Sequence, residues 1–395
     1  MADFFKRELF KSLKKQNIFL FGPRQSGKTT LIKEWLQTVE RYLSINLLKN
    51  DELIKYQSNP AQLRKELEFE ISKSDAPLFV FVDEIQKCPS LLDEIHFLIE
   101  EYKDAVYFIL TGSSARKLKR ASVNMLGGRA VQKTMHPLTF SELGEHFNLD
   151  KVICGGSLPP YYNMDSEERS EGLHAYVNTY LKEEIINEAL TRNVPAFSKF
   201  LMLAGESSGD IINYSNIARE TGVSSGTIKE YFQILEDTLV GFSLVPFLRS
   251  VRKQIIQHPK FYLFDLGVIN QLCGRNVNGI PRGGAVWGKL FEHFFVLELK
   301  RFIDYHRRNW ELYYWRTRQG YEVDVVLKTE DKLFALEIKG GRNIDKRDMK
   351  GLKLFEQEHE GAIPICIAIT DKPFLLDKVP VIPWELFFTG EYVGD

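Results

Sequence analysis

The sequence has few cysteines, no long apolar run and almost no net charge, and each absence excludes a class of protein. Its four cysteines, Cys88, Cys154, Cys273 and Cys366, are far apart and form no Cys-x-x-Cys pair. A disulfide framework or a structural zinc site is therefore not expected, and a reducing compartment is favoured. No apolar run reaches the roughly 18 residues that span a bilayer, and MADFFKRELFKSLKKQ lacks the apolar segment of a secretory signal. We expect a cytoplasmic protein without a membrane partner.

Charge and hydrophobicity are those of a globular chain. The 395 residues include 52 Lys and Arg against 53 Asp and Glu, and 44% are hydrophobic. A wholly disordered chain is excluded, and any contact with nucleic acid must come from local patches. At roughly 150 residues per domain, the length predicts two to three domains. Composition places the boundaries at 1–150, 151–275 and 276–395, with a glycine-rich linker opening the last part.

The first part alternates short apolar runs with amphipathic stretches. The runs are Asn17–Phe21, Tyr42–Asn46, Leu78–Val82 and Ala105–Leu110. Strands that alternate with helices in this way predict an α/β fold with a parallel sheet and helices on both faces.

The first apolar run leads directly into a phosphate-loop motif. The pattern G-x-x-x-x-G-K-[ST] lies within Gly22, Pro23, Arg24, Gln25, Ser26, Gly27, Lys28, Thr29 and Thr30. The glycines allow positive φ, so successive backbone N–H groups turn inward and form an anion nest at a helix N-terminus. Lys28 is expected to reach the β- and γ-phosphates of ATP, and the Thr29 hydroxyl to bind Mg²⁺. ATP and Mg²⁺ are the expected cofactors.

Polar residues follow the next apolar runs at the points where strands should end. Leu78–Val82 ends in Asp83 and Glu84, about 55 residues after the phosphate loop. At the carboxyl edge of a parallel sheet, Asp83 would hold Mg²⁺ and Glu84 would polarise the attacking water. Ser113 follows the fourth run, where it would either sense the γ-phosphate or cap a helix.

A run of basic residues without an acidic one comes next. Its members are Arg116, Lys117, Lys119, Arg120, Arg129 and Lys133. The run would face DNA or nucleotide, or it would be a solvated loop. Arg129 follows two glycines that allow close approach of its guanidinium, as in an arginine finger or a γ-phosphate sensor. The sequence does not decide whether Arg129 acts on its own nucleotide or on that of a neighbouring chain.

The middle segment carries the apolar spacing of a helix-turn-helix. Ser215 is expected to cap the first helix, and Gly222 to make the turn before the second. Leu239–Pro246 and Gln254–Phe264 are expected to form the hairpin of a wing. Basic residues surround this hairpin at Arg249, Arg252, Lys253 and Lys260. Such a winged helix would either bind DNA, mainly by phosphate contacts of the wing, or serve as a packing module.

The last part predicts a second α/β unit with its own polar cluster. A buried helix at Trp287–Val296 carries one carboxylate, Glu292, and strand-like runs follow at Trp310–Trp315, Tyr321–Leu327 and Leu333–Ile338. Period-two alternation places Glu337 and Lys339 on one face of the third run. A hairpin of the last two runs would bring Asp324 to that face, with Glu292 reaching in from the helix.

Two carboxylates and a lysine suit metal-assisted cleavage of a phosphodiester. Asp324 and Glu337 would bind Mg²⁺, with Glu292 completing the set of ligands, and Lys339 would orient the water or neutralise charge. The alternatives are an exposed Glu–Lys pair on a half-buried strand, or a fold that retains these residues without catalysis.

The motifs, taken in order, resemble a known family. GPRQSGKTT, LFVFVDEIQKCPSL, LTGSS, LGGRA and HPLTFSEL resemble prokaryotic AAA-type ATPases related to the archaeal ATPase group. WGKLFEHFFVLEL, EVDVVL and ALEIKGG are similar to the domain of unknown function that usually follows them, which is itself similar to restriction-endonuclease-like, PD-(D/E)XK folds. The resemblance implies an additional-strand P-loop fold and places the C-terminal residues above on the nuclease-like motif. Such ATPases often form rings, so monomer, dimer and larger homo-oligomer all stay open.

Two functions follow from these expectations. The first is an ATP-hydrolysing switch that binds DNA and controls a C-terminal nuclease. The second is an ATP-dependent regulatory or scaffolding protein whose C-terminal domain binds a partner or nucleic acid without cutting it. A small-molecule kinase fits less well, because it explains neither the Asp83–Glu84 pair nor the long C-terminal extension.

Overall fold

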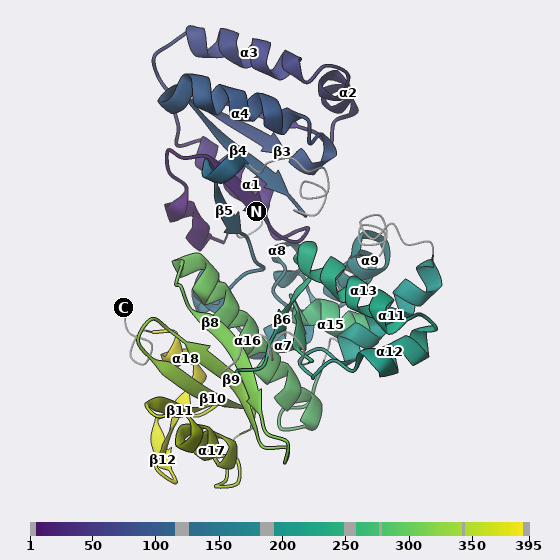
Figure 1. Cartoon of the computed structure of the whole chain (residues 1–395), viewed down its shortest axis with the longest axis vertical. Coiled ribbons are helices and arrows are strands. Elements are labelled where there is room, and N and C mark those ends of the chain that lie inside the picture. Colours follow the sequence, from purple (N-terminus) through teal and green to yellow (C-terminus); the bar gives the residue numbers. More distant parts are fainter. Residues whose placement is uncertain are drawn as a thin grey trace.

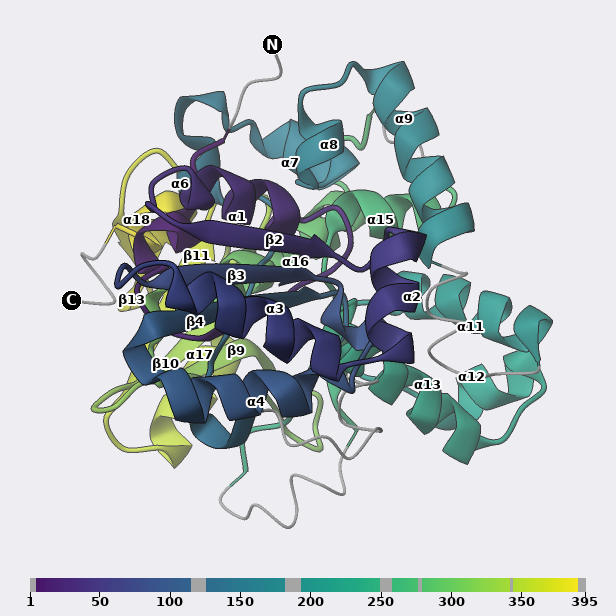
Figure 2. The same cartoon turned by 90° about the horizontal axis from the view of Figure 1, so that it is seen from above.

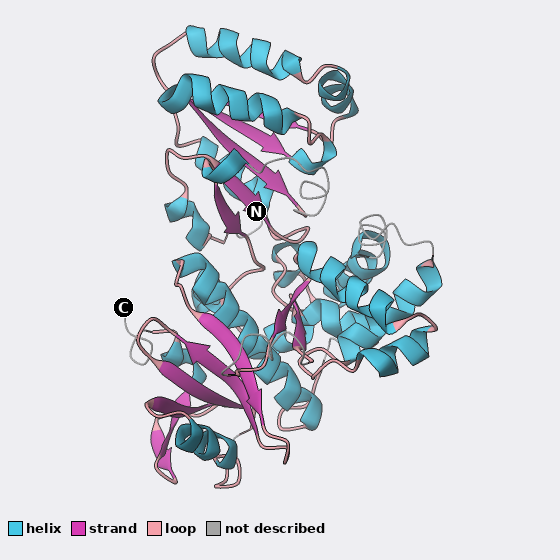
Figure 3. Ribbon diagram, in the orientation of Figure 1, coloured by secondary structure: helices cyan, strands magenta, loops and turns pink. Residues whose placement is uncertain are grey.

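The computed structural model describes residues 5–114, 126–181, 193–248, 258–275, 279–341 and 344–389. Its N-terminal unit, at the top of Figures 1 and 3, is built on a parallel sheet. The sheet has five strands in the order β2-β3-β4-β1-β5. The strands are β1 (Ile18–Phe21), β2 (Tyr42–Asn46), β3 (Leu78–Asp83), β4 (Val106–Gly112) and β5 (Val131–Thr134). The predicted parallel α/β fold and its first four strands are confirmed. β5 was not predicted, because its sequence VQKT lacks an apolar run.

Helices cover both faces of this sheet because its central strands are apolar on both sides. Phe79 and Phe81 of β3 belong to the cluster that includes α1 (Lys28–Leu36), whereas Val80 and Val82 belong to the cluster on the opposite face. That face is covered by α2 (Asn50–Ser58), α3 (Ala61–Ser72) and α4 (Leu91–Tyr102). Figure 2 shows α1 and α4 on opposite sides of the strands. A parallel sheet buried on two faces explains the continuous apolar run LFVFV.

The chain between β5 and α16 is mainly helical. The short helix α6 (Phe140–Leu143) precedes the middle segment, which begins within α7 (Leu149–Gly155) and continues with α8 (Pro159–Tyr162), α9 (Ser166–Ala175) and the π-helical turn η6 (Tyr176–Leu181). The helical pitch changes at Tyr176, and residues 182–192 lie outside the described part. The remaining helices are α11 (Val194–Glu206), α12 (Tyr214–Thr221), α13 (Ser225–Asp237) and α15 (Leu266–Leu272).

The predicted helix-turn-helix pair and hairpin both form. Gly222 ends α12 with φ 74° and lets the chain turn into α13. Asn213 caps α12 in place of the predicted Ser215, because Asn213 has non-helical backbone just before the helix and its side chain accepts the Asn216 N–H, while Ser215 lies in the first turn. β6 (Gly241–Leu244) pairs antiparallel with β7 (Lys260–Leu263). The basic residues 249–253 of the expected wing lie outside the described residues.

The C-terminal unit is a mixed sheet behind one long helix. The helix α16 (Ala285–His306) leads into an antiparallel meander of β8 (Glu311–Arg316), β9 (Glu322–Lys328) and β10 (Leu333–Lys339). The three strands and the hairpin of the last two were predicted, and the pairing of β8 with β9 was not. α17 (Lys350–Glu358) then crosses to β11 (Ala362–Ala368), which is parallel to β10. β12 (Phe374–Leu376), β13 (Val379–Pro383) and α18 (Trp384–Phe387) complete the unit, whose sheet has the order β12-β13-β11-β10-β9-β8.

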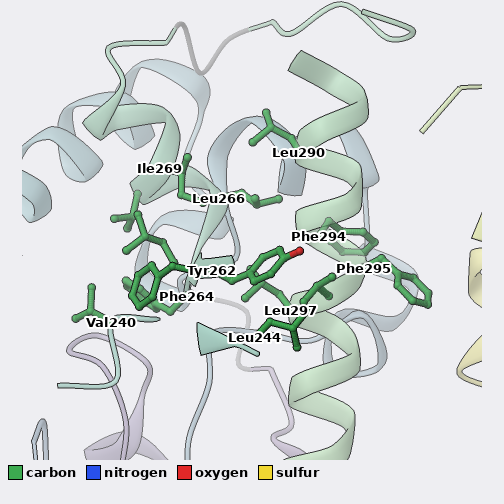
Figure 4. Close-up of a cluster of buried hydrophobic side chains, with 14 of the residues drawn as sticks. Val240, Leu244, Tyr262, Phe264, Leu266, Ile269, Leu290, Phe294, Phe295 and Leu297 are labelled. Atoms are coloured by element: carbon green, nitrogen blue, oxygen red, sulfur yellow. The ribbon is translucent and has the colours of Figure 1, made fainter. Parts of the chain in front are cut away.

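One hydrophobic core joins the middle and C-terminal units. Figure 4 shows Tyr262, Leu266 and Ile269 of the middle segment packed beside Leu290 and Phe294 of α16. This shared core fixes the β6–β7 hairpin against the C-terminal helix. Within the described residues, no helix is both long and apolar enough to cross a membrane.

Candidate nucleotide site and carboxylate–lysine site

The phosphate loop joins the end of β1 to the start of α1. Gln25 (φ 62°) and Gly27 (φ 94°) have left-handed backbone, which turns the loop back on itself before Lys28. The Lys28 ammonium donates to the carbonyls of Gly22 (2.8 Å) and Pro23 (3.0 Å) and is only 6% exposed. The Lys28 ammonium is therefore held against the backbone of the loop. Phosphate oxygens of a bound nucleotide would compete with the two carbonyls for its hydrogen bonds.

Thr29, Asp83 and Thr111 bring oxygen ligands together beside this loop. The Thr29 hydroxyl lies 3.1 Å from Asp83 Oδ2, and the Thr111 hydroxyl donates to Asp83 Oδ1 at 2.5 Å. Asp83 ends β3 and is 3% exposed, so the carboxyl edge of the sheet positions it as predicted. Hydroxyl and carboxylate oxygens are ligands that Mg²⁺ prefers, and Mg²⁺ at phosphate sites usually takes few protein ligands. The residues fit this ion.

Glu84 lies next to the loop in left-handed backbone (φ 63°, ψ 47°). Its carboxylate accepts a 2.5 Å hydrogen bond from the Gln86 amide, whose nitrogen also lies 3.2 Å from the Ser113 hydroxyl. The predicted water-polarising residue and the predicted γ-phosphate sensor are thus joined through Gln86. Sequence reasoning missed Gln86, because a polar residue in a short turn has no periodic signal.

Glu84 and the phosphate loop line a cleft of ≈ 530 Å³. Its lining consists of Phe5, Arg7, Arg24, Gln25, Gly27, Lys28, Thr29, Thr30, Leu31, Glu84, Leu138, Pro159 and Pro160. Among the described residues, the buried oxygens of the Gln25 and Ser26 side chains have no hydrogen-bond partner. The lining combines charged and polar groups with apolar side chains, among them two prolines. Such a lining suits a ligand that carries both phosphates and a flat base.

Arg7 is a site residue that the sequence did not reveal. Its guanidinium donates to the Ser26 carbonyl of the phosphate loop (2.7 Å), to Glu142 Oε1 (2.9 Å), to the His136 carbonyl (2.6 Å) and to the Tyr305 hydroxyl (3.2 Å). The side chain is 5% exposed. Arg7 therefore joins the phosphate loop to the C-terminal end of α16.

Arg129 lies elsewhere. Its exposed guanidinium pairs with Glu100 of α4, and it does not line the nucleotide cleft. An action on a neighbouring chain's nucleotide stays a prediction. Residues 116–120 of the basic run lie outside the described residues, whereas Lys133 is buried on β5.

The C-terminal residues meet where the pairing of β9 and β10 ends. The last ladder pair is Val325 with Leu336, and beyond it Asp324 Oδ2 accepts the Ile338 N–H at 2.8 Å. Lys339 donates to Glu337 Oε1 at 2.7 Å. Burial, reinforced by the negative charge of Glu337, raises the pKa of Asp324 well above its usual value. Burial likewise raises the pKa of Glu337 to about 7, against the opposing effect of Lys339.

Glu292 reaches the same region from α16, but its partners come from the middle segment. The Lys260 ammonium of β7 lies 3.4 Å from Glu292 Oε1 and 2.6 Å from Glu322 Oε1, and Lys260 is 4% exposed. The Tyr262 hydroxyl donates to Glu292 Oε1 at 3.2 Å, and Figure 4 shows this hydroxyl directed at α16. Lys260 was predicted only as a basic residue near a wing.

An ammonium group therefore occupies the carboxylate cluster. Burial alone lowers the pKa of Lys260, but the nearby Tyr262, Glu292, Asp324 and Glu322 groups raise it well above its usual value. Across the described parts of the chain, no three carboxylate, imidazole or thiol groups gather as ligands for one metal ion. As these side chains lie, the cluster is balanced by lysines and does not fit a divalent ion. The predicted Mg²⁺ site of Glu292, Asp324 and Glu337 stays a prediction.

The nucleotide site agrees with the comparisons to known protein families. Residues 14–144 match the AAA domain family. The match supports ATP binding and hydrolysis in general, as predicted. Residues 146–278 and 287–387 match two further families, each described as a domain of unknown function (DUF8612 and DUF4143). The expected C-terminal domain of unknown function is therefore present, and its nuclease-like interpretation is left to experiment.

Similar whole chains come from bacteria and archaea. An uncharacterized protein of Mycobacterium tuberculosis is 24% identical over 327 residues, covering 82% of this chain and 70% of its own. An uncharacterized protein of Methanocaldococcus jannaschii is 22% identical over 420 residues, covering 95% and 85%. Among solved structures, the replication initiator DnaA bound to AMPPCP and single-stranded DNA has a TM-score of 0.28 and 13% identity, covering 58% of this chain and 85% of DnaA. At this TM-score the likeness does not extend to the overall arrangement.

Proposed function

We propose that this protein is a Mg²⁺-dependent ATPase that binds DNA and uses the ATP cycle to control its C-terminal nuclease-like domain. The observation that carries the ATPase is the contact of Thr29 with Asp83, beside Lys28 and Glu84, at the carboxyl edge of a parallel sheet. The phosphate loop, the Thr29 hydroxyl and the candidate base Glu84 line one cleft, and the Asp83 carboxylate lies against Thr29. Together they are the set that phosphoryl transfer to water requires.

Each residue has a distinct role in this proposal. The phosphate-loop N–H groups and Lys28 hold the β- and γ-phosphates, and Thr29 and Asp83 hold Mg²⁺. When bound, Mg²⁺ neutralises charge on the phosphate oxygens. Glu84 orients the attacking water and accepts its proton, while Gln86 fixes the direction of the Glu84 carboxylate.

Control of the C-terminal domain is supported by the path from Arg7 along α16. Arg7 contacts the phosphate loop through Ser26 and α16 through Tyr305. His136 also pairs with Asp304 of α16 at 2.8 Å. Glu292 lies on the same helix, thirteen residues from Tyr305, which is roughly 20 Å along a helix. A shift of the loop on hydrolysis would thus act on one end of a rigid helix whose other part carries a residue of the C-terminal cluster.

Two substitutions test the ATPase. Lys28→Ala should abolish ATP binding or turnover. Glu84→Gln should bind ATP with unchanged affinity but hydrolyse it slowly, because the metal ligands stay and the base is lost. Lys33→Ala, on the exposed side of α1, is the matched control and should behave as wild type. Wild-type turnover by Glu84→Gln would show that Glu84 is not the base.

A second function is favoured by Lys260. Because its ammonium fills the carboxylate cluster, the C-terminal domain as described suits binding of a partner or nucleic acid without cleavage. Wild type and Asp324→Ala/Lys339→Ala proteins should be incubated with supercoiled plasmid, single-stranded DNA and RNA, with Mg²⁺ or Mn²⁺, with and without ATP. Cleavage that is lost in the variant would establish the nuclease. Intact ATPase activity without any cleavage would establish the second function.

A further inference from the structure

A second cleft, distinct from the nucleotide cleft, lies between the N-terminal turn η1 (Glu8–Ser12) and the C-terminal end of α16. Its volume is ≈ 750 Å³. It is lined by Lys6, Arg7, Glu8, Lys11, Ser12, Lys14, Gln16, Ser141, Glu142, Tyr305, His306 and Arg307. We call it the junction groove. Figure 1 shows the upper end of α16 beneath β5, where the N-terminal and C-terminal units meet.

Positive charge dominates this groove. Of its two carboxylates, Glu142 is fully buried and paired with Arg7, which leaves Glu8 to face four other basic side chains. The four are Lys6, Lys11, Lys14 and Arg307. All of them are exposed, and none forms an ion pair with a described carboxylate. Elsewhere on the described surface many cations are paired, as in Lys55–Glu66 and Lys328–Glu311. In a chain of net charge −1, this concentration of cations is a local feature of the groove.

A buried lysine adds to the charge behind the groove wall. Lys133 of β5 is 5% exposed, and its ammonium donates to the hydroxyl of Ser12, a lining residue, at 2.9 Å. No described carboxylate pairs with it, and its charged neighbours are Lys14 and Arg307. A buried ammonium among like charges is unfavourable unless an anion lies nearby. The fold thus maintains an unbalanced cation at this position.

We propose that the junction groove binds the phosphodiester backbone of a nucleic acid strand. The cations come from two segments of the chain, three from η1 and its flanks (Lys6, Lys11 and Lys14) and one from the end of α16 (Arg307). Such an arrangement matches a row of phosphates, each neutralised by a separate Lys or Arg. The choice of nucleic acid rests on the proposed function; the groove is separate from the helix-turn-helix and the hairpin considered above.

Arg7 places this groove next to the nucleotide. It lines both clefts, and its partner Glu142 also accepts the backbone N–H of Glu8 at 2.9 Å. A strand in the junction groove would therefore lie one side chain away from the phosphate loop. Occupancy of one cleft is expected to change affinity in the other, in both directions and by the same factor.

The test measures how tightly the full chain binds fluorescein-labelled single-stranded DNA, duplex DNA and RNA. Fluorescence anisotropy gives the dissociation constants at several salt concentrations, without ATP. Lys11→Glu/Arg307→Glu should weaken binding at least tenfold, and Lys11→Ala/Arg307→Ala should reduce the slope of log K against log salt by about 2. Lys65→Glu/Lys103→Glu reverses two exposed charges outside the groove and should bind as wild type. Circular dichroism checks that each variant is folded.

Three outcomes would overturn the proposal. The first is that the wild-type chain binds none of the three nucleic acids. The second is that the groove variant binds as tightly as wild type. The third is that pyrophosphate displaces the labelled strand as well as an unlabelled strand does at the same phosphate concentration. The last would assign the groove to a small phosphate anion. Since neither ATP turnover nor cleavage is scored, a chain that binds DNA through the groove but hydrolyses no ATP would refute the proposed ATPase and leave this inference standing.

Discussion

The ammonium nitrogen of Lys260 lies 2.6 Å from a carboxylate oxygen of Glu322, although the lysine belongs to the β6–β7 hairpin and the glutamate to the C-terminal sheet. The same nitrogen lies 3.4 Å from Glu292 Oε1. The hairpin is also joined to β8 by backbone, because Phe247 N donates to the Tyr314 carbonyl at 2.6 Å. The positive charge that balances Glu292 and Glu322 therefore comes from the middle segment and depends on its packing against the C-terminal unit.

Lys260→Met should expose this dependence, since it removes the buried cation and keeps most of the side-chain stem. Loss of one partner from a buried ion pair should lower the free energy of unfolding by about 3 kcal/mol. Because the remaining carboxylates then repel one another, millimolar Mn²⁺ should stabilise the variant more than wild type. Urea unfolding with and without MnCl₂ measures both effects.

Lys328→Met is the matched control for this experiment. Lys328 pairs with Glu311 on the exposed side of the same sheet. Its removal should change stability by less than about 1 kcal/mol and produce no response to Mn²⁺. If Mn²⁺ raised the free energy of unfolding of Lys260→Met no more than that of wild type, the Lys260 ammonium would not occupy a position that a metal ion can fill.

Gln86→Leu should separate ATP binding from hydrolysis. The Gln86 amide donates to Glu84 Oε2, so its loss removes a hydrogen bond that directs the carboxylate that orients the water, while Lys28, Thr29 and Asp83 keep their places. We expect an unchanged ATP dissociation constant and a turnover about tenfold lower, corresponding to about 1.4 kcal/mol of barrier. Single-turnover hydrolysis and titration with a fluorescent ATP analogue give the two quantities. Gln57→Leu, on exposed α2, is the control, and wild-type turnover in Gln86→Leu would rule out this positioning role.

The nucleotide site could largely be predicted because its geometry is local. The spacing of the phosphate loop fixes Lys28 and Thr29 relative to β1, and parallel strands bring the residues that follow them to one edge. Asp83 and Glu84 therefore lie where the sequence places them. The C-terminal strands could also be predicted, because each of them is a short run rich in apolar residues.

The contacts that the sequence did not reveal join segments that are distant along the chain. Arg7 meets Tyr305 across 298 positions, and Lys260 meets Glu292 across 32. No period or motif marks such pairs, because each is created by the packing of separate units. Arg129 shows the converse: its neighbouring glycines were a local signal, but the fold places its guanidinium against Glu100.

Arg7 and Glu142 should prove energetically coupled. Both side chains are buried, and either Arg7→Met or Glu142→Gln leaves the other without its oppositely charged partner. Each single variant should lose about 3 to 5 kcal/mol of unfolding free energy. The double variant should lose less than the sum, because no lone charge then remains buried. Additivity within about 0.5 kcal/mol in urea unfolding would mean that the two residues act independently.

Lys133 predicts how pH acts on the junction groove. Burial, together with the charges of Arg307 and Lys14, lowers the pKa of Lys133 to about 8, from 10.5 for an ordinary lysine. Below pH 8 the folded chain carries the unfavourable charge in full. Between pH 8 and about 10.5 the folded chain loses a proton that the unfolded chain keeps, so the free energy of unfolding should rise with pH in this window.

Strand binding should show the opposite trend, because the charged form of Lys133 is the one that attracts phosphate. DNA affinity should fall as pH rises from 7.5 to 9.5, a range in which ordinary lysines stay charged and histidines stay neutral. Lys133→Met should bind more weakly at pH 7.5 and lose this pH-dependent fall, whereas Lys65→Met should keep it. Anisotropy titrations at each pH measure the trend. A fall of wild-type size in Lys133→Met would show that another group titrates, and that Lys133 does not contribute charge to the bound strand.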